Sequence, residues 1–168
     1  TVRIQWVSGV DAKDLTRAEI EGREQMVEMI NFITQKINGF EDAYLLCSAT
    51  QVGVRETRRI VGDFVLTEKD VLSGRKFPDA IARGSYPIDI HSPPGKGTKW
   101  TPLPAGASYD IPYRCLIPAK MHNLLIAGRP ISVTHEAFSS TRVSPTCMIV
   151  GQAAGVAAAL AIKDKVPP

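Results

Sequence analysis

The spacing of apolar residues predicts a long amphipathic helix near the start of the chain, over residues 11–37. Apolar side chains recur there at three- and four-residue steps, at Met26, Ile30, Ile33 and Ile37. Thr16 and Glu19 have the spacing of a capping box, and Asn38-Gly39 is a typical helix end. The charges crowded into the first half predict a helix face that is open to solvent.

Short apolar runs in the middle of the chain predict strands. These are 43–49, 56–66 with a bend or hairpin at Gly62-Asp63, a strand pair within 80–91, and the extended stretch 109–117. Pro87 restricts the strand pair to an edge or a bulge. Between them, residues 67–70 start a single helical turn that stops at Gly74.

Residues 92–108 are rich in proline and glycine, which predicts a loop and the boundary between two structural units, 1–108 and 109–168. The loop contains Gly95-Lys96-Gly97. No strand precedes this glycine pair at the right distance and no helix follows it, so it fails as a dinucleotide-binding fingerprint.

The last part of the chain predicts a buried strand and a buried helix. Residues 123–128 (NLLIAG) are a compact apolar run, typical of a strand covered on both faces. At Ser144-Pro145, serine can act as N-cap and proline as the first helical residue of a helix that runs to about Ile162. This helix is apolar nearly all round, which predicts burial on most sides. It is short for a membrane span and holds Gln152 at its middle, so no span is expected.

Composition changes this picture little. Of the 168 residues, 44% are hydrophobic and 22% charged, as in an ordinary soluble globular protein. The net charge of +3 comes from short, scattered basic stretches, which argues against nucleic-acid binding. Cys47, Cys115 and Cys147 stand far apart, so we expect no metal site and three reduced, mostly buried thiols. The chain opens at Thr1 without an initiator Met, which suggests a processed product or a piece of a longer protein. Its sequence indicates no cellular compartment.

Residues 123–162 have the organisation of a ligand site. Ligands of open α/β sheets lie beyond the carboxyl ends of strands, where Gly128-Arg129 stands. The helix start at 144–147 offers backbone N–H groups and a positive dipole end, which stabilise negative charge on a bound ring system. The loop between these two elements is unusually polar: His135, Glu136, Ser139, Ser140, Thr141 and Arg142.

Three stretches resemble a known family. Residues 109–161 (YDIPYRCLIPAKMHNLLIAGRPISVTHEAFSSTRVSPTCMIVGQAAGVAAALA) are similar to the C-terminal signature of a large group of bacterial and archaeal FAD-dependent oxidoreductases with the glutathione-reductase-type FAD fold. Residues 53–71 (GVRETRRIVGDFVLTEKDV) and 85–91 (SYPIDIH) resemble that family's substrate-side domain. The family's N-terminal strand–GxGxxG–helix, which grips the ADP part of FAD, does not occur in the sequence.

The resemblance implies an α/β fold, here an α+β fragment. Residues 1–108 would form a mixed substrate-side or cap region, and 109–168 the last strand and helix of a Rossmann-like FAD-binding domain. Gly128-Arg129 would lie along the pyrophosphate and ribityl chain, although many relatives carry an acidic residue in place of Arg129. The turn Ser144-Pro145-Thr146-Cys147 would place backbone N–H groups at the N1 and C2-carbonyl edge of the flavin and stabilise its reduced, anionic form. Pro145 has no N–H, so Thr146 and Cys147 are the expected donors.

Arg142 and His135 resemble, more distantly, an Arg and a His of the fumarate reductase branch, where the Arg holds a substrate carboxylate near flavin N5. The alternatives are a structural ion pair for Arg142 and a backbone-bonded loop histidine for His135. His91, which ends PIDIH, is a third catalytic candidate, whereas His122 is expected at the surface.

The charged run Arg55, Glu56, Arg58 and Arg59 leaves two interpretations open. If residues 55–59 form a strand, Arg55 and Arg59 share one face while Glu56 and Arg58 share the other. The alternating signs favour a structural lattice of salt bridges. An arginine directed at an anionic substrate is the alternative.

The expected function is the transfer of a hydride or electron pair between FAD and an unidentified small-molecule substrate. The chain alone is expected to be inactive and to bind FAD weakly or not at all, because its expected partner, the N-terminal FAD-binding half, holds the pyrophosphate-gripping loop. Self-association through a partly bare helix over 145–162 would make a homo-oligomer. The alternatives are a binding or interaction module without catalysis, and a polysaccharide-acting lyase or hydrolase, for which the sequence offers no motif of paired carboxylates.

Overall fold

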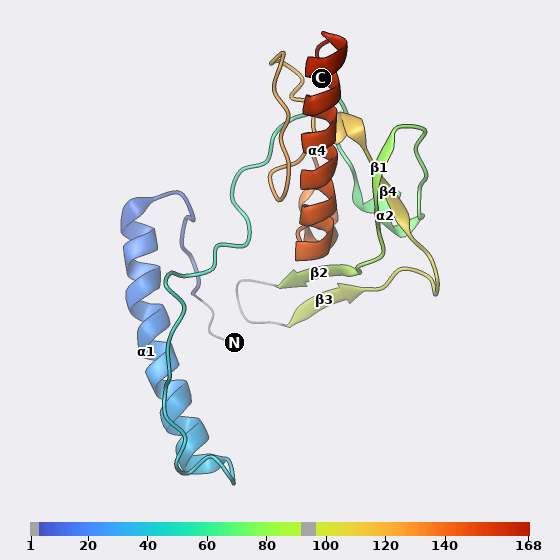
Figure 1. Cartoon of the computed structure of the whole chain (residues 1–168). Helices are drawn as coiled ribbons and strands as arrows, with labels where there is room; N and C mark the ends of the chain where they lie inside the picture. Colours follow the sequence, from blue (N-terminus) through green and yellow to red (C-terminus); the bar gives the residue numbers. More distant parts are fainter. Residues whose placement is uncertain (1–3, 92–96) are drawn as a thin grey trace. The chain divides into compact units, whose positions relative to one another are not determined.

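The computed structural model describes residues 4–91 and 97–168 (Figure 1). The chain divides into two compact units, Thr1–Thr57 and Arg58–Pro168. The boundary that the sequence predicts near residue 108 falls inside the second unit, and it stays a prediction about domains of the intact protein.

The first unit is built on α1, Ala12–Lys36, which confirms the predicted amphipathic helix. Asp11 caps its start by accepting a hydrogen bond from the Asp14 N–H at 3.0 Å. The predicted cap at Thr16 is wrong, because the Thr16 hydroxyl lies inside the helix and donates to the carbonyl of Ala12. The charges on its exposed face form i,i+4 pairs such as Arg17–Glu21 at 3.0 Å.

The predicted buried strand at 43–49 is wrong. The segment forms no strand, and the side chains of Tyr44 and Leu46 are 80% and 83% exposed. A strand needs a hydrogen-bonded neighbour, and the chain that follows bonds to α1 instead. Arg23 donates to the Ser48 hydroxyl at 3.1 Å, and Glu19 accepts from the Val52 N–H.

The second unit contains two antiparallel two-stranded sheets (Figure 1). Strand β1, Ala80–Gly84, pairs with β4, Tyr109–Pro112, and β2, Ile88–His91, pairs with β3, Thr98–Thr101. The two strands predicted within 80–91 therefore exist, but each pairs with a strand from further along the chain.

The predicted loop at 92–108 is partly corrected. Strand β3 occupies its middle, while residues 92–96, including the first two of Gly95-Lys96-Gly97, lie outside the described residues. The predicted extended run 109–117 ends earlier than expected, because η1, Tyr113–Cys115, is a 3₁₀ turn directly after β4.

The strand with a bend or hairpin that is predicted for residues 56–66 does not form as a hairpin. Gly62 bridges to Pro118 and Leu66 bridges to Val133, so this segment pairs with two others far away in sequence. The predicted helical turn is confirmed as α2, Glu68–Leu72, with a complete capping box between Thr67 and Asp70.

Two predictions about residues 123–142 are wrong. Residues 123–128 form no strand, and Leu125, Ile126 and Ala127 are only half-buried. The stretch predicted as a polar loop contains α3, His135–Thr141, which Thr134 caps by accepting from the Ala137 N–H. Because α3 buries its last three hydroxyl residues, their side chains bond to carbonyls inside the protein rather than to water.

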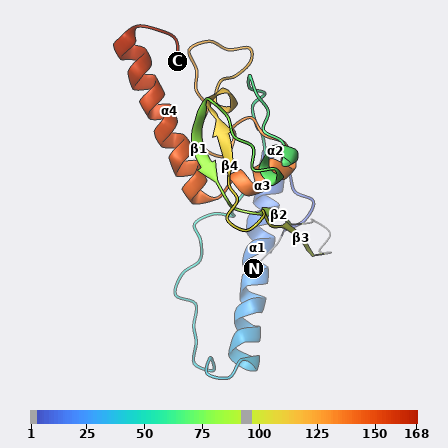
Figure 2. The same ribbon diagram turned by 90° about the vertical axis from the view of Figure 1, so that its right-hand side faces the viewer.

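The long helix α4, Ser144–Asp164, confirms the predicted C-terminal helix, although Val143 rather than Ser144 is its N-cap residue. It packs along β1 (Figure 2). The expected burial on most sides is not found in this chain, since only Thr146 and Val150 are buried. By length and composition alone α4 could cross a membrane, which is weak evidence because core helices of soluble proteins pass the same test.

The core of the second unit lies between β1, β4, α2, α3 and one side of α4. Its largest fully buried side chains include Leu66, Ile88, Tyr109, Ile111, Leu116, Ile131 and Phe138. A Cβ on Gly84 would stand 2.5 Å from the Tyr109 ring, so glycine is required where β1 passes that ring.

Asp110 and Asp70 are buried charged residues of this unit, and Asp110 lies on β4. Asp110 accepts hydrogen bonds from the Phe77 N–H and from Arg83 and Lys76, each at 3.3 Å. Burial alone would raise the pKa of this carboxyl, but these donors together hold the pKa below its ordinary value.

The lowered pKa of Asp110 predicts how stability depends on pH. Below the ordinary aspartate pKa of about 4, the unfolded chain binds a proton that the folded protein does not, so the free energy of unfolding falls as the pH drops. We expect Asp110→Asn to lose about 1–2 kcal/mol at neutral pH and to weaken this acid dependence. Urea unfolding at several pH values measures both. The exposed Asp164→Asn serves as the control, and an equal acid dependence in both variants would contradict the prediction.

Candidate functional site

Two of the predicted catalytic residues, Arg142 and His91, meet at Asp89 of β2. Arg142 Nη2 donates to the Asp89 carbonyl oxygen at 2.9 Å. His91 Nε2 lies 3.1 Å from the carboxylate oxygen Oδ2 of the same residue. The sequence places Arg142 about fifty positions after His91, and the packing of α3 against β2 brings them together.

Two hydroxyl groups complete this cluster. The Asp89 N–H donates to the Ser139 hydroxyl at 3.1 Å, and the Thr98 hydroxyl of β3 lies 3.3 Å from His91 Nδ1. Sequence reasoning missed the part that Asp89 and Thr98 play. The alternation in PIDIH could have indicated Asp89, since residues two apart in a strand share one face.

His135 lies elsewhere on α3. It is the exposed first residue of that helix, whereas Arg142 is its C-cap, which is about 10 Å of helix away. Next to it, hydrogen bonds from the Glu136 backbone and the Thr134 side chain lower the pKa of the Glu136 carboxyl, and electrostatic interactions with His135 and Lys99 add to the effect. His135 therefore belongs to a charged group at the start of α3, distinct from the Asp89 cluster.

The predicted cofactor-binding residues come from two segments that lie close together. Gly128 has φ +80°, a left-handed conformation that favours glycine, and the space around its missing Cβ is open. Partial burial raises the pKa of the Cys147 thiol above its ordinary value. The positive charge of Arg129 acts in the other direction and offsets part of this rise in pKa. Arg129 is thus close enough to Cys147 for its charge to act on the thiol.

The first turn of α4 corrects one predicted donor. The Cys147 N–H donates to the Val143 carbonyl at 3.0 Å and is thus the first hydrogen bond of the helix. Among the described residues, the N–H groups of Ser144 and Thr146 have no backbone acceptor, because they precede that bond. Pro145 offers no N–H. Thr146 and Ser144, rather than Thr146 and Cys147, are therefore the available donors.

Arg59 and Arg142 both lie near the ring of Phe138. The guanidinium carbon of Arg59 lies 5.4 Å from the centre of the Phe138 ring, and that of Arg142 lies 5.8 Å from the same centre. Residues 55–59 form no strand, so the predicted division of their side chains between two faces does not occur.

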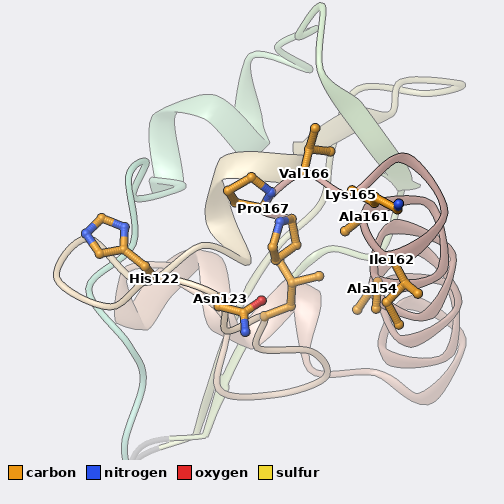
Figure 3. A pocket seen from close by; sticks show the side chains of 11 residues that line it. His122, Asn123, Ala154, Ala161, Ile162, Lys165, Val166 and Pro167 are labelled. Atoms are coloured by element: carbon orange, nitrogen blue, oxygen red, sulfur yellow. The ribbon is translucent and has the colours of Figure 1, made fainter.

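One hollow of the described residues is lined by none of these side chains (Figure 3). It is a shallow groove of about 730 Å³ between the second half of α4 and the turn at His122 and Asn123, with the C-terminal residues along it. Its lining is mostly apolar: Leu125, Ala154, Ala158, Ala161, Ile162, Val166, Pro167 and Pro168. Because it brings no group of acids, bases or nucleophiles together, we do not assign chemistry to it.

The cysteines do not form a site. All three are free thiols, and Cys47 is exposed rather than buried as expected. Burial raises the pKa of the Cys115 thiol to about 12, so it is inert at neutral pH. Within residues 4–91 and 97–168, no group of three or more His, Cys, Asp or Glu side chains could hold a metal ion.

Comparison with known proteins gives the family. The whole chain, residues 1–168, matches the family described as FAD dependent oxidoreductase, and the chain belongs to that family. No curated protein and no solved structure shows a significant match. The fold of this family member is thus a mixed α+β arrangement of helices and small antiparallel sheets.

The proximity of Arg129 to Cys147 can be measured through thiol reactivity. Replacing Arg129 by Gln removes a charge that favours the thiolate, so the pKa of Cys147 rises further and its alkylation slows by about two- to threefold at constant pH. Mass spectrometry after timed iodoacetamide treatment gives the rate at each cysteine. Cys47 is the internal reference, and the exposed Arg58→Gln is the matched control. Unchanged labelling of Cys147 in Arg129→Gln would show that the two segments are not neighbours.

Proposed function

We propose that the intact enzyme transfers a hydride or an electron pair between FAD and a small-molecule substrate, and that this chain supplies the flavin-side helix start and part of the substrate site. The observation that carries the proposal is the family membership of the whole chain together with the neighbouring positions of the 128–129 turn and the first turn of α4. A bound FAD would accept or donate the hydride.

The residues present fit a flavin. In the first turn of α4, Ser144 and Thr146 offer N–H groups at the positive end of a helix dipole, which favours an electron-rich ring edge. Gly128, with open space at its Cβ position, lets a ligand approach the backbone closely. Arg129 adds a positive charge suited to a pyrophosphate. We assign Gly128, Arg129 and Ser144-Pro145-Thr146-Cys147 to cofactor binding.

The substrate side of the proposal rests on the Asp89 cluster. Arg142 and His91 are the proposed catalytic residues, because both are held at one residue of β2 and both retain partial exposure. His135 is proposed as a third catalytic residue, which would act from the exposed start of α3, outside the Asp89 cluster.

The proposed partner is an N-terminal FAD-binding half of the same protein. The 168 residues contain no GxGxxG motif after a strand, and the family grips the ADP of FAD with that motif. The exposed apolar side of α4 supports a missing partner, since Met148 and Ile162 are 75% and 80% exposed. In this proposal residues 1–108 belong to the substrate-side region and 109–168 to the FAD-binding domain.

The flavin absorbance spectrum tests this function. We expect bands at about 375 and about 450 nm in the full-length protein, and weak or absent bands in the 168-residue chain after addition of FAD. Separate expression of the missing half, followed by mixing, should restore the bands if α4 docks on it. A full-length protein without flavin, even after FAD is added, would refute the enzyme proposal and favour a non-catalytic binding module.

The helix start can be tested on the full-length flavoprotein. Thr146→Pro removes an N–H that makes no intrahelical bond, and proline is tolerated in the first helical turn. We expect it to lower the flavin midpoint potential, because the reduced, anionic flavin loses a hydrogen-bond donor. Thr146→Val, which keeps the N–H and the side-chain shape, is the control. Equal potentials in the two variants would exclude Thr146 as a flavin donor.

A further inference from the structure

Asp89 holds both proposed catalytic residues with different atoms. Its carbonyl oxygen accepts from Arg142, its carboxylate accepts from His91, and its N–H donates to the Ser139 hydroxyl. The Asp89 side chain is only 14% exposed, so little water competes for the carboxylate. Strand β2 and helix α3 are thereby joined at the residue that also orients the histidine.

The partners of His91 determine the role of each ring nitrogen. An ionised carboxylate can only accept hydrogen bonds, so His91 Nε2 must carry the hydrogen that Asp89 accepts. In the neutral ring Nδ1 is then the acceptor, and its partner at 3.3 Å is the Thr98 hydroxyl, which can donate. The three side chains form a line from a nearly buried carboxylate, through a ring that is 29% exposed, to an exposed hydroxyl on β3.

We propose that Asp89, His91 and Thr98 form a proton-transfer chain for an alcohol or amine substrate, with Asp89 as the positioning residue that makes His91 Nδ1 the proton acceptor. This rests on the proposed function. The substrate carbon loses a hydride to FAD, and its oxygen or nitrogen loses a proton to the Thr98 oxygen. The original Thr98 proton moves to His91 Nδ1, and the product is a carbonyl compound or an imine. The Asp89 carboxylate stabilises the resulting imidazolium.

The geometry allows the role of Asp89 toward His91 to be separated from its role toward Arg142. Arg142 bonds to the backbone carbonyl, which every substitution at position 89 keeps. Asp89→Ala therefore removes the histidine's acceptor and leaves the arginine contact available. Thr98→Val removes the terminal hydroxyl in a side chain of similar shape and leaves the Asp89–His91 bond in place.

The first experiment reads the histidine directly, in full-length protein with ¹⁵N-labelled histidine. We expect a slowly exchanging imidazole N–H proton signal, assigned by its loss in His91→Gln, with ¹⁵N shifts that place the hydrogen on Nε2. The signal should vanish in Asp89→Ala and persist in Thr98→Val and in the exposed control Asp63→Ala. A hydrogen on Nδ1 of the neutral ring, or a signal that survives Asp89→Ala, overturns the proposal.

The second experiment follows anaerobic bleaching of the flavin by benzyl alcohol and by benzylamine. We expect the limiting rate to fall about 10- to 100-fold in Asp89→Ala and Thr98→Val, with little change in the half-saturating probe concentration, and to stay within about twofold in Asp63→Ala. Equal rates in Asp89→Ala and Asp63→Ala, or a parent flavin that neither probe bleaches, overturn the proposal. A parent protein without flavin would instead refute the proposed function, while the imidazole signal would still report the Asp89–His91 pair.

Discussion

The buried hydroxyl of Tyr109 is the contact on which the arrangement of the second unit depends. It lies 2.7 Å from the Ser140 hydroxyl, which in turn donates to the carbonyl of Tyr86. Burial raises the pKa of Tyr109 to about 12, so its hydroxyl stays a neutral donor. One chain of hydrogen bonds thus connects β4, helix α3 and the segment that leads into β2. The Tyr109 ring also fills the space that Gly84 leaves open on β1.

This contact places the candidate site. Because Ser140 is fixed between Tyr109 and Tyr86, its neighbour Ser139 faces β2 and meets the Asp89 N–H. One helical turn on the same side leads to the end of α3, where Arg142 reaches the Asp89 carbonyl. Neutral hydroxyls thus hold a charged site in register, which costs less desolvation than buried ion pairs would.

Local signals predicted the elements that local interactions determine. The apolar period of α1 and the helical turn that starts at residues 67–70 are recognised within one or two turns of chain, and both helices form. The apolar runs at 43–49 and 123–128 failed as strands, because apolar character indicates burial but does not provide a hydrogen-bonded neighbour. The prediction for residues 135–142 was wrong in the opposite way, because polar character there did not mean a loop. Their hydroxyls were expected in a polar loop, yet they bond inward from a short helix that Thr134 caps.

Only some residues of the candidate site could be predicted from the sequence, and the way they meet could not. His91 and Arg142 could be chosen from the sequence, whereas their shared contact with Asp89 depends on how α3 packs against β2. The same distinction applies to the cofactor residues. Helix α4 begins at the proposed flavin contacts and continues as a largely exposed apolar helix. In the proposed assembly, whatever covers its apolar side also fixes the direction of its first turn. Burial of α4 against a partner and binding of the cofactor are then coupled, because each of them fixes the position of the first turn of α4.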